Sequence, residues 1–412
     1  MVQAPNILWI VTTQWRAQAC AYAGDPNART PCLDALARES VNYVQAVTPH
    51  PFGPFARAAL LTGVPSPANG VHDYFDPLPA HGRTIAHELG ARGYATAYFG
   101  KWHLGNRDPH APLVGEASAK AVVPAEARGG FAFWEGFEGG FLANDPWLHG
   151  TRLPHPVRFE GYQSDVVCAR AAEFLRGSSG PWFCCVSLEA PHPPYDAPAS
   201  GVRPSAASGL SLPPNVPKGN LSEERARREL AGYYAHIEAT DRAVGRLVEA
   251  APCRGAIVVF TSVHGDMHGA HGLFRKGWPY EESVRVPLLV RRPGVPAAAD
   301  SSSISLLDLP AQTLAWAQRT PPPPLPVQAS LSMPSVVRLP DQCDRIWRGV
   351  RTPARKLILS EDGSPWLFFD LKNDPYELQN LASAPSSAPE IEELRRSEAF
   401  QPNFKTEKSK NQ

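Results

Sequence analysis

The sequence predicts an α/β fold with a mainly parallel, mixed central sheet sandwiched by helices, followed by a small C-terminal α+β subdomain with antiparallel strands. Short apolar runs alternate with amphipathic helical segments over residues 1–320, which is typical of a sheet buried between two helical layers. Residues 321–340 are rich in proline and indicate a linker. Residues 341–398 predict the small subdomain, and the polar residues 399–412 predict a disordered tail.

The first elements follow from local patterns. Residues 6–12 (NILWIVT) form an apolar run bounded by polar residues, as in a buried strand. A helix is expected next, because Thr30 can cap it and Pro31 suits its first turn. Helical spacing over residues 84–93 ends at a glycine, and residues 94–100 predict the second strand.

The remaining elements continue the alternation. Residues 161–176 and 222–250 predict amphipathic helices, the second opened by Ser222 with a nearby glutamate as a capping-box variant. Residues 182–188 and 256–261 predict buried strands. In the subdomain, residues 345–360 and 366–371 predict neighbouring antiparallel strands, with a helix near residues 389–396.

Composition excludes several classes of function. The chain has 412 residues, 43% of them hydrophobic, and a formal net charge of zero, which argues against nucleic acid or an acidic membrane surface as a partner. No apolar segment approaches the roughly 20 residues that a membrane span needs, and the start of the chain lacks the features of a signal peptide. We therefore expect a soluble, cytoplasmic protein, and leave its oligomeric state open.

Cysteine and histidine spacing gives little further chemistry. The seven cysteines are scattered and predict buried, inert thiols; Cys184 and Cys185 lie in one strand-like run and should face opposite ways. His268 and His271 are close in sequence, but nothing in their spacing fixes a shared geometry, so we do not predict a zinc site there.

The most informative segment is residues 48–63 (TPHPFGPFARAALLTG). The residues from Arg57 onward predict a helix that ends at Gly63, after a proline- and glycine-rich turn that presents backbone amides. A helix N-terminus beside an arginine suits an anion. Polar residues also follow four predicted strands, where ligands of parallel sheets gather: Thr13 and Gln14, Lys101 and His103, His192, and Val263 and His264.

Together these motifs resemble the sulfatase family over nearly the whole chain. The resemblance is carried by the run around residues 53–63, by residues 100–105 (GKWHLG), by the segment around Lys276, and by residues 369–381 near the C-terminus. It implies a nucleophile, a Cys or Ser converted to formylglycine, at the head of the helix that contains Arg57. That position holds Gly53 or, in an alternative alignment, Phe52, and neither side chain can attack a sulfur or phosphorus centre.

The resemblance also implies roles for the polar residues. Lys101 and His103 resemble the pair that grips the sulfate and assists the nucleophile, and His192 resembles the general acid for the departing alcohol. Arg57, Lys101 and Lys276 correspond to substrate-binding residues.

A calcium site is the family's metal centre, and its residues are altered here. The two aspartate positions hold Thr13 and Val263, which leaves Gln14 and His264 as residual metal positions, and Asp266 is expected to face outward. Calcium prefers several charged oxygen ligands, so no cofactor is expected.

Three functions follow. The leading hypothesis is a catalytically impaired sulfatase-type hydrolase, a pseudoenzyme whose basic cavity binds a small sulfate- or phosphate-bearing molecule. The alternatives are an active sulfate, phosphate or phosphonate ester hydrolase with a divergent mechanism, and a non-catalytic partner subunit of an active sulfatase. The leading hypothesis assumes a cavity that has kept its bases and lost its acids.

Overall fold

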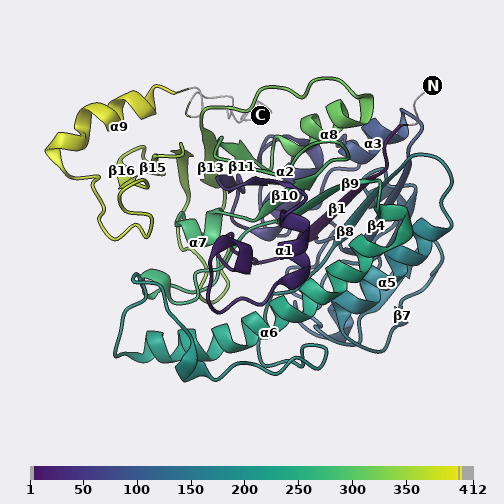
Figure 1. The fold of residues 1–412 in the computed structure, drawn as a ribbon. Coiled ribbons are helices and arrows are strands. Elements are labelled where there is room, and N and C mark those ends of the chain that lie inside the picture. Colours follow the sequence, from purple (N-terminus) through teal and green to yellow (C-terminus); the bar gives the residue numbers. More distant parts are fainter. Residues whose placement is uncertain (1–3, 398–399, 401–412) are drawn as a thin grey trace, which may run out of the picture.

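The computed structural model describes residues 4–397 and 400, and it contains a central sheet of ten strands flanked by helices (Figure 1). The strands lie in the order β11-β2-β10-β9-β1-β8-β4-β5-β6-β7. Their bounds are β11 Ala298–Asp300, β2 Val41–Tyr43, β10 Leu288–Arg291, β9 Ile257–Ser262, β1 Ile7–Thr12, β8 Trp182–Ser187, β4 Ala95–Lys101, β5 Phe133–Phe137, β6 Trp147–Gly150 and β7 Val157–Arg158.

The middle of this sheet is parallel and its edges are mixed. Strands β9, β1, β8, β4 and β5 pair in parallel, whereas β10 pairs antiparallel with both β9 and β2, and β6 pairs antiparallel with β5 and β7. Val11 of β1 lies opposite Thr261 of β9 on one side and Ser187 of β8 on the other. The predicted α/β fold class is therefore confirmed.

Helices cover both faces of the sheet (Figure 1). On one face lie α2 (Gly53–Thr62), α3 (Ile85–Gly90) and α8 (Leu309–Gln318); on the other lie α1 (Pro31–Ala37), α5 (Gln163–Arg176) and α6 (Leu221–Glu249). The side chains of Cys184 and Cys185 enter the two opposite cores, as the strand pattern predicts. All seven cysteines are free, and all are buried except the half-buried Cys32.

A second, four-stranded antiparallel sheet forms the C-terminal subdomain. It consists of β13 (Ala329–Met333), β14 (Trp347–Arg351), β15 (Arg355–Ser360) and β16 (Pro365–Asp370), and is followed by α9 (Ala388–Arg395). Strand β13 lies within residues 321–340, so this sheet begins before the predicted boundary at residue 341. Leu331, Met333 and Trp347 pack into the core of the large domain. The tail predicted at residues 399–412 lies, apart from Phe400, outside the described residues.

Two helix starts differ from the prediction. Helix α2 begins at Gly53 rather than at Arg57, because Phe52 is the last extended residue and Pro54 lies in the first turn. Helix α6 is capped by Asn220, not Ser222: the Asn220 side chain accepts a hydrogen bond from the Glu223 amide at 3.1 Å. At its other end, α2 stops as predicted at Gly63, which has a φ of 69°.

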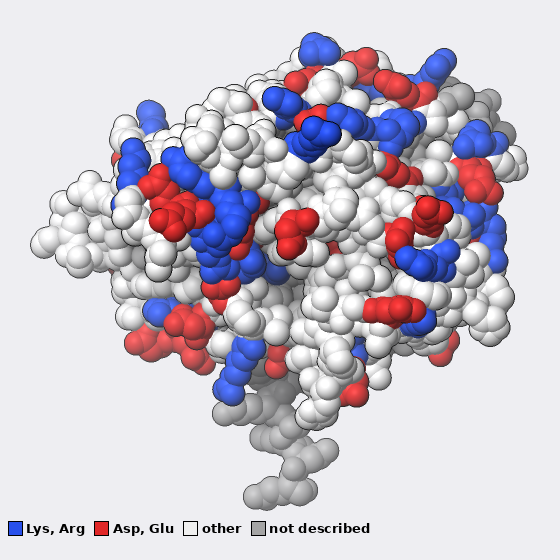
Figure 2. Space-filling model, turned by 90° about the horizontal axis from the view of Figure 1, so that it is seen from below, with Lys and Arg blue, Asp and Glu red and all other residues white. Residues whose placement is uncertain are grey.

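Several short elements complete the fold. These are β3 (Ala46–Val47), β12 (Ile304–Ser305), α4 (Glu116–Ala119) and α7 (Glu281–Val284). Within the described residues, no helix is both long and apolar enough to cross a bilayer. On the face drawn in Figure 2, acidic and basic side chains are interspersed and no broad area of one sign is seen.

Candidate functional site

A cavity of about 390 Å³ lies beyond the carboxyl ends of the central parallel strands. It collects side chains that are far apart in the sequence. Of the residues singled out from the sequence, its wall contains Thr13, Phe52, Gly53, Lys101, His103, His192, His264 and Lys276. Arg57, Gln14 and Val263 lie behind this wall.

The head of α2 opens onto the cavity. A Cβ atom placed on Gly53 would lie 3.0 Å from Nδ1 of His103, so this position faces the predicted catalytic histidine. Phe52 instead packs edge-on against Tyr74, with ring centroids 5.6 Å apart, and is 1% exposed. Of the two alignments for the nucleophile, the geometry favours Gly53, and this residue offers no reactive group.

Arg57 is held behind the cavity by hydrogen bonds to protein atoms. Its guanidinium donates to Thr13 Oγ1 at 2.7 Å, to Ser187 Oγ at 2.6 Å and to the Lys101 carbonyl oxygen at 3.1 Å. The Thr13 hydroxyl in turn donates to the Leu188 carbonyl oxygen at 3.0 Å. Arg57 therefore links the carboxyl ends of β1, β8 and β4, and its positive charge lies behind the cavity wall.

Lys101 projects into the cavity beside an acidic residue that the sequence did not reveal. Its Nζ lies 2.7 Å from Glu189 Oε1 and 4.4 Å from the centroid of the Phe141 ring. Burial lowers the pKa of the Lys101 ammonium, and the charge of Glu189 opposes that shift. The other Glu189 oxygen accepts a hydrogen bond from Gln163 at 3.0 Å.

His103 is a neutral imidazole. It is 6% exposed, and burial together with the charges of Arg107, Lys101 and Arg57 holds its pKa well below the usual value. Its Nε2 lies 3.3 Å from the Tyr74 hydroxyl. The backbone φ of His103 is 58°, which turns the side chain back toward the head of α2.

His192 is also held neutral. Its ring stacks on Phe141 with centroids 4.6 Å apart, and its Nδ1 donates to the Pro193 carbonyl oxygen at 2.9 Å. The remaining nitrogen, Nε2, lies 3.3 Å from the Lys276 ammonium and accepts from it. Burial, followed by the charges of Lys276 and Lys101, keeps the pKa of His192 well below its usual value.

Gln14 forms the centre of a buried chain of polar contacts. Its Oε1 accepts from Lys276 Nζ at 2.6 Å, while its Nε2 donates to Asp266 and, at 3.2 Å, to the Tyr195 hydroxyl. Asp266 also accepts from Tyr195 at 2.8 Å and is fully buried. The expectation that Asp266 faces outward is therefore wrong.

The residues at the calcium positions do not fit that ion. Val263 lies in the hydrophobic core, and His264 directs Nδ1 to the Gly265 carbonyl oxygen at 2.8 Å, which leaves its buried Nε2 without a hydrogen-bond partner. The two possible oxygen ligands are already bound by cations: Gln14 by Lys276, and Thr13 by Arg57. None of the four positions supplies a carboxylate, whereas calcium takes six or more oxygens.

The sequence suggested that the cavity had lost its acidic residues, but the structure places acidic side chains in and beside it. Glu189 and Asp266 neutralise part of the charge of Lys101 and Lys276, and Asp341 lies on the cavity wall. The sequence could have indicated Glu189 as a site residue, because it directly follows a predicted strand and lies three residues before His192. Asp266 had no such signal, since its direction depends on the turn after β9.

Comparison with known proteins identifies the family of this chain. A family model described as Sulfatase matches residues 5–319. The chain is 34% identical to an ulvan-active sulfatase of Formosa agariphila, over 92% of this chain and 78% of that protein, and 26% identical to an arylsulfatase of Clostridium perfringens, over 95% and 93%. The crystal structure of yidJ from Bacteroides fragilis superposes with a TM-score of 0.83 at 26% identity, covering 95% of this chain and 94% of that one. The chain thus belongs to the sulfatase family.

Proposed function

We propose that this sulfatase-family protein binds a small sulfate- or phosphate-bearing molecule in the cavity and lacks the covalent and calcium chemistry of a sulfuric ester hydrolase. The observation that carries the proposal is at the head of α2. Gly53 faces His103 with no side chain, so no group is present to form a covalent intermediate. The altered metal positions support the same conclusion, because cations of the protein itself already bind Thr13 and Gln14.

Anion binding is supported by the charges on the cavity wall. Lys276 contacts the neutral acceptors Gln14 and His192 directly, so its charge is available to a ligand. Lys101 is paired with Glu189, which neutralises part of its charge, so Lys101 contributes less to anion binding than Lys276. The first amides of α2 add a favourable dipole, and its first turn contains no acidic residue.

A direct test combines binding, turnover and metal content. Purified protein is titrated calorimetrically with sulfate and with an aryl sulfate, and assayed for hydrolysis and bound calcium. We expect binding, no turnover and no stoichiometric calcium, with binding weakened at least about tenfold in Lys276→Ala. Arg242→Ala, an exposed change on α6, is the matched control. Turnover with one calcium per chain contradicts the proposal, and so does a failure of any anion to bind.

A second function, hydrolysis without a covalent intermediate, is favoured by one observation. Gly53 and His103 both line the cavity, and the pKa of His103 is lowered by burial, so its imidazole is a base to which a water molecule in the cavity would lose a proton. Lys101 and Lys276 would then stabilise the developing negative charge. Activity that is lost in His103→Ala but kept in His72→Ala, a change at an exposed histidine, would favour this second function.

A further inference from the structure

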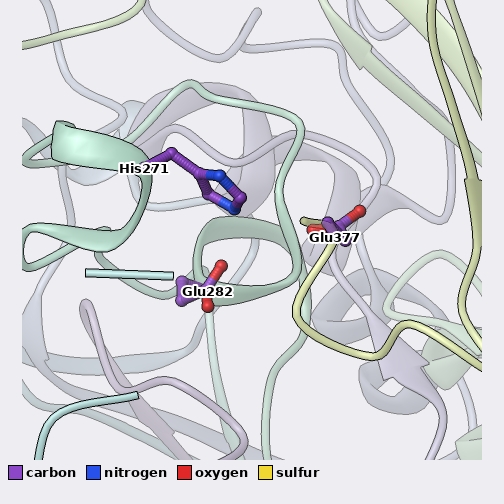
Figure 3. Close-up of side chains that lie close together, drawn as sticks. All are labelled: His271, Glu282 and Glu377. Atoms are coloured by element: carbon purple, nitrogen blue, oxygen red, sulfur yellow. The ribbon is translucent and has the colours of Figure 1, made fainter. Parts of the chain in front are cut away.

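A second polar cluster lies where the large domain meets the C-terminal subdomain. We call it the junction cluster: His271 from a single turn after β9, Glu282 from α7, and Glu377 from the segment after β16 (Figure 3). One nitrogen or oxygen atom from each side chain lies within 4.8 Å of the others. The cavity described above shares none of these residues.

Two of the three side chains, those of His271 and Glu377, are held in place by local contacts. His271 has a φ of 55° and stacks on Tyr280 with ring centroids 4.1 Å apart. Glu377 has a φ of 57°, and one of its oxygens accepts from the Glu281 amide at 2.8 Å. A left-handed backbone at a histidine and a glutamate is costly, and such residues cluster where side chains must be aimed at a site.

The carboxylates of this region are unequally compensated. Glu281 is paired with Arg351 at 2.8 Å and with Lys356 at 3.2 Å, and Lys356 also contacts Glu377. Glu282 is only 5% exposed and forms no ion pair with any described residue. One of its oxygens, Oε2, has no hydrogen-bond partner at all among those residues. A buried carboxylate without a direct ion pair is unfavourable.

Asn215 fills the space between the acceptors. Its Nδ2 lies 2.7 Å from Glu282 Oε1, 3.2 Å from His271 Nε2 and 3.1 Å from the Tyr376 carbonyl oxygen, although an amide nitrogen has only two hydrogens. Its own Oδ1 is buried without a partner. Glu282 and His271 of the junction cluster and the Tyr376 carbonyl oxygen therefore converge on the Asn215 amide nitrogen, in the space between the acceptors where a cation would lie.

The junction cluster can be reached from solvent. A separate cavity of about 330 Å³ is lined by Arg16, Asp25, Glu282 and Tyr376, so the unpartnered carboxylate lies on its wall. Arg16 lines the same cavity without forming an ion pair with Glu282. An ion would therefore approach the junction cluster from the side of Glu282.

We propose that the junction cluster binds one divalent transition-metal ion, with zinc as the probe, and that this ion clips the C-terminal subdomain to the large domain. The ligands are His271 Nε2 and one oxygen each from Glu282 and Glu377, and rotation of the Asn215 amide brings Oδ1 to the fourth position. Imidazole and carboxylate are a ligand set that suits zinc. Ligands about 2.0–2.1 Å from zinc lie roughly 3.3 Å apart, so the cluster contracts by about 1–1.5 Å on binding. Lys356 then keeps its ion pair with Glu281 and gives up its contact with Glu377.

The experiment uses the full chain after treatment with a chelator. Zinc is titrated back, bound metal is counted after gel filtration, and Tm is measured with and without zinc. We expect one zinc at this site and a rise in Tm of about 3–5 °C at a hundredfold excess over Kd. Glu282→Gln should lose both effects, and without zinc it should be at least as stable as the parent, since it removes a buried carboxylate that forms no ion pair with any described residue.

Controls separate the junction cluster from other zinc ligands. His271→Ala should lose the same zinc, whereas His110→Ala, at an exposed histidine, and Glu393→Gln, on the exposed face of α9, should keep it. The proposal is overturned by an unchanged Tm of the parent protein on adding zinc, by zinc bound equally in Glu282→Gln, or by a Glu282→Gln protein that is less stable than the parent without metal.

Discussion

At the scale of single residues, the proposed anion binding in the cavity beside Gly53 depends on the charge of Lys276. It lies between two neutral acceptors, Gln14 and His192, and burial lowers the pKa of its ammonium to about 7, against the opposing charge of Asp266. An anion needs the protonated form, which is lost as the pH rises through 7. The affinity for sulfate should therefore fall about tenfold between pH 6 and pH 8.

Calorimetric titration of sulfate at several pH values tests this prediction. Lys276→Arg should remove the pH dependence, because a guanidinium stays charged throughout this range. An affinity that is the same at pH 6 and pH 8 in the parent protein would show that Lys276 is not the residue that titrates.

Gly53 is the second decisive residue. We predict that Gly53→Cys gives no sulfatase activity, because Thr13 and Val263 still provide no carboxylate for calcium. The new side chain would contact His103, since a Cβ lies 3.0 Å from Nδ1, and should cost about 1–3 kcal/mol of stability. An aryl-sulfate assay and urea unfolding of the same preparation measure both effects. Activity from this single change would show that the metal positions matter less than we infer.

At the scale of elements, the order of the parallel strands assembles the site. Strands β9, β1, β8 and β4 are neighbours, and their carboxyl ends deliver His264, Gln14, Glu189 and Lys101 to the same edge of the sheet. Each strand contributes only one or two polar residues. The cavity therefore depends on the pairing of strands that are distant in the sequence, more than on any single motif.

Helix α6 supports the loop that carries His192, and one glycine sets their distance. A Cβ on Gly232 would lie 1.8 Å from the Tyr195 carbonyl oxygen, which is closer than any allowed contact. Gly232→Ala should therefore destabilise the protein by about 3 kcal/mol or more, despite the higher helix propensity of alanine.

The matched control for this change is Gly90→Ala in α3. A Cβ there meets nothing nearer than Thr96 Cγ2 at 4.0 Å, so the substitution should be neutral or stabilise by up to about 1 kcal/mol. Urea unfolding of the two variants gives the comparison. Equal effects at both positions would mean that the close approach of α6 to Tyr195 is not maintained in solution.

At the scale of the whole molecule, buried neutral histidines set the response to acid. His50 and His236 are each 1% exposed, and burial lowers the pKa of each to about 4. The unfolded chain binds protons at these histidines below about pH 6.5, while the folded chain does not. The free energy of unfolding is therefore highest above pH 6.5 and decreases as the pH falls. The decrease between pH 7 and pH 5 is about 2 kcal/mol for each such histidine.

Urea unfolding at pH 7 and pH 5 checks this prediction. His50→Gln should reduce the difference between the two free energies of unfolding, whereas His72→Gln, at an exposed position, should not. A protein that is equally stable at both pH values would contradict the proposal that its histidines are buried and neutral.

The sequence alone determined the fold class and most of the long elements. Apolar runs such as residues 6–12 and 256–261 can bury all their side chains only in a sheet that is covered on both faces. The motifs around Arg57 and Lys101 indicated the family. It missed short strands such as β10, because four residues carry too little pattern to separate a strand from a loop.

Only the tertiary structure showed which charged side chains meet in the cavity beside Gly53 and in the junction cluster. Asp266 was expected to face outward and Glu189 was not singled out, but strand pairing and the turn after β9 place Glu189 in an ion pair with Lys101 and Asp266 against the Gln14 amide. His271 and Glu377 lie more than a hundred residues apart and meet only because the small sheet docks on the large domain. Local periodicity specifies which residues are buried, but side-chain electrostatics depends on distances that exist only after the chain has folded.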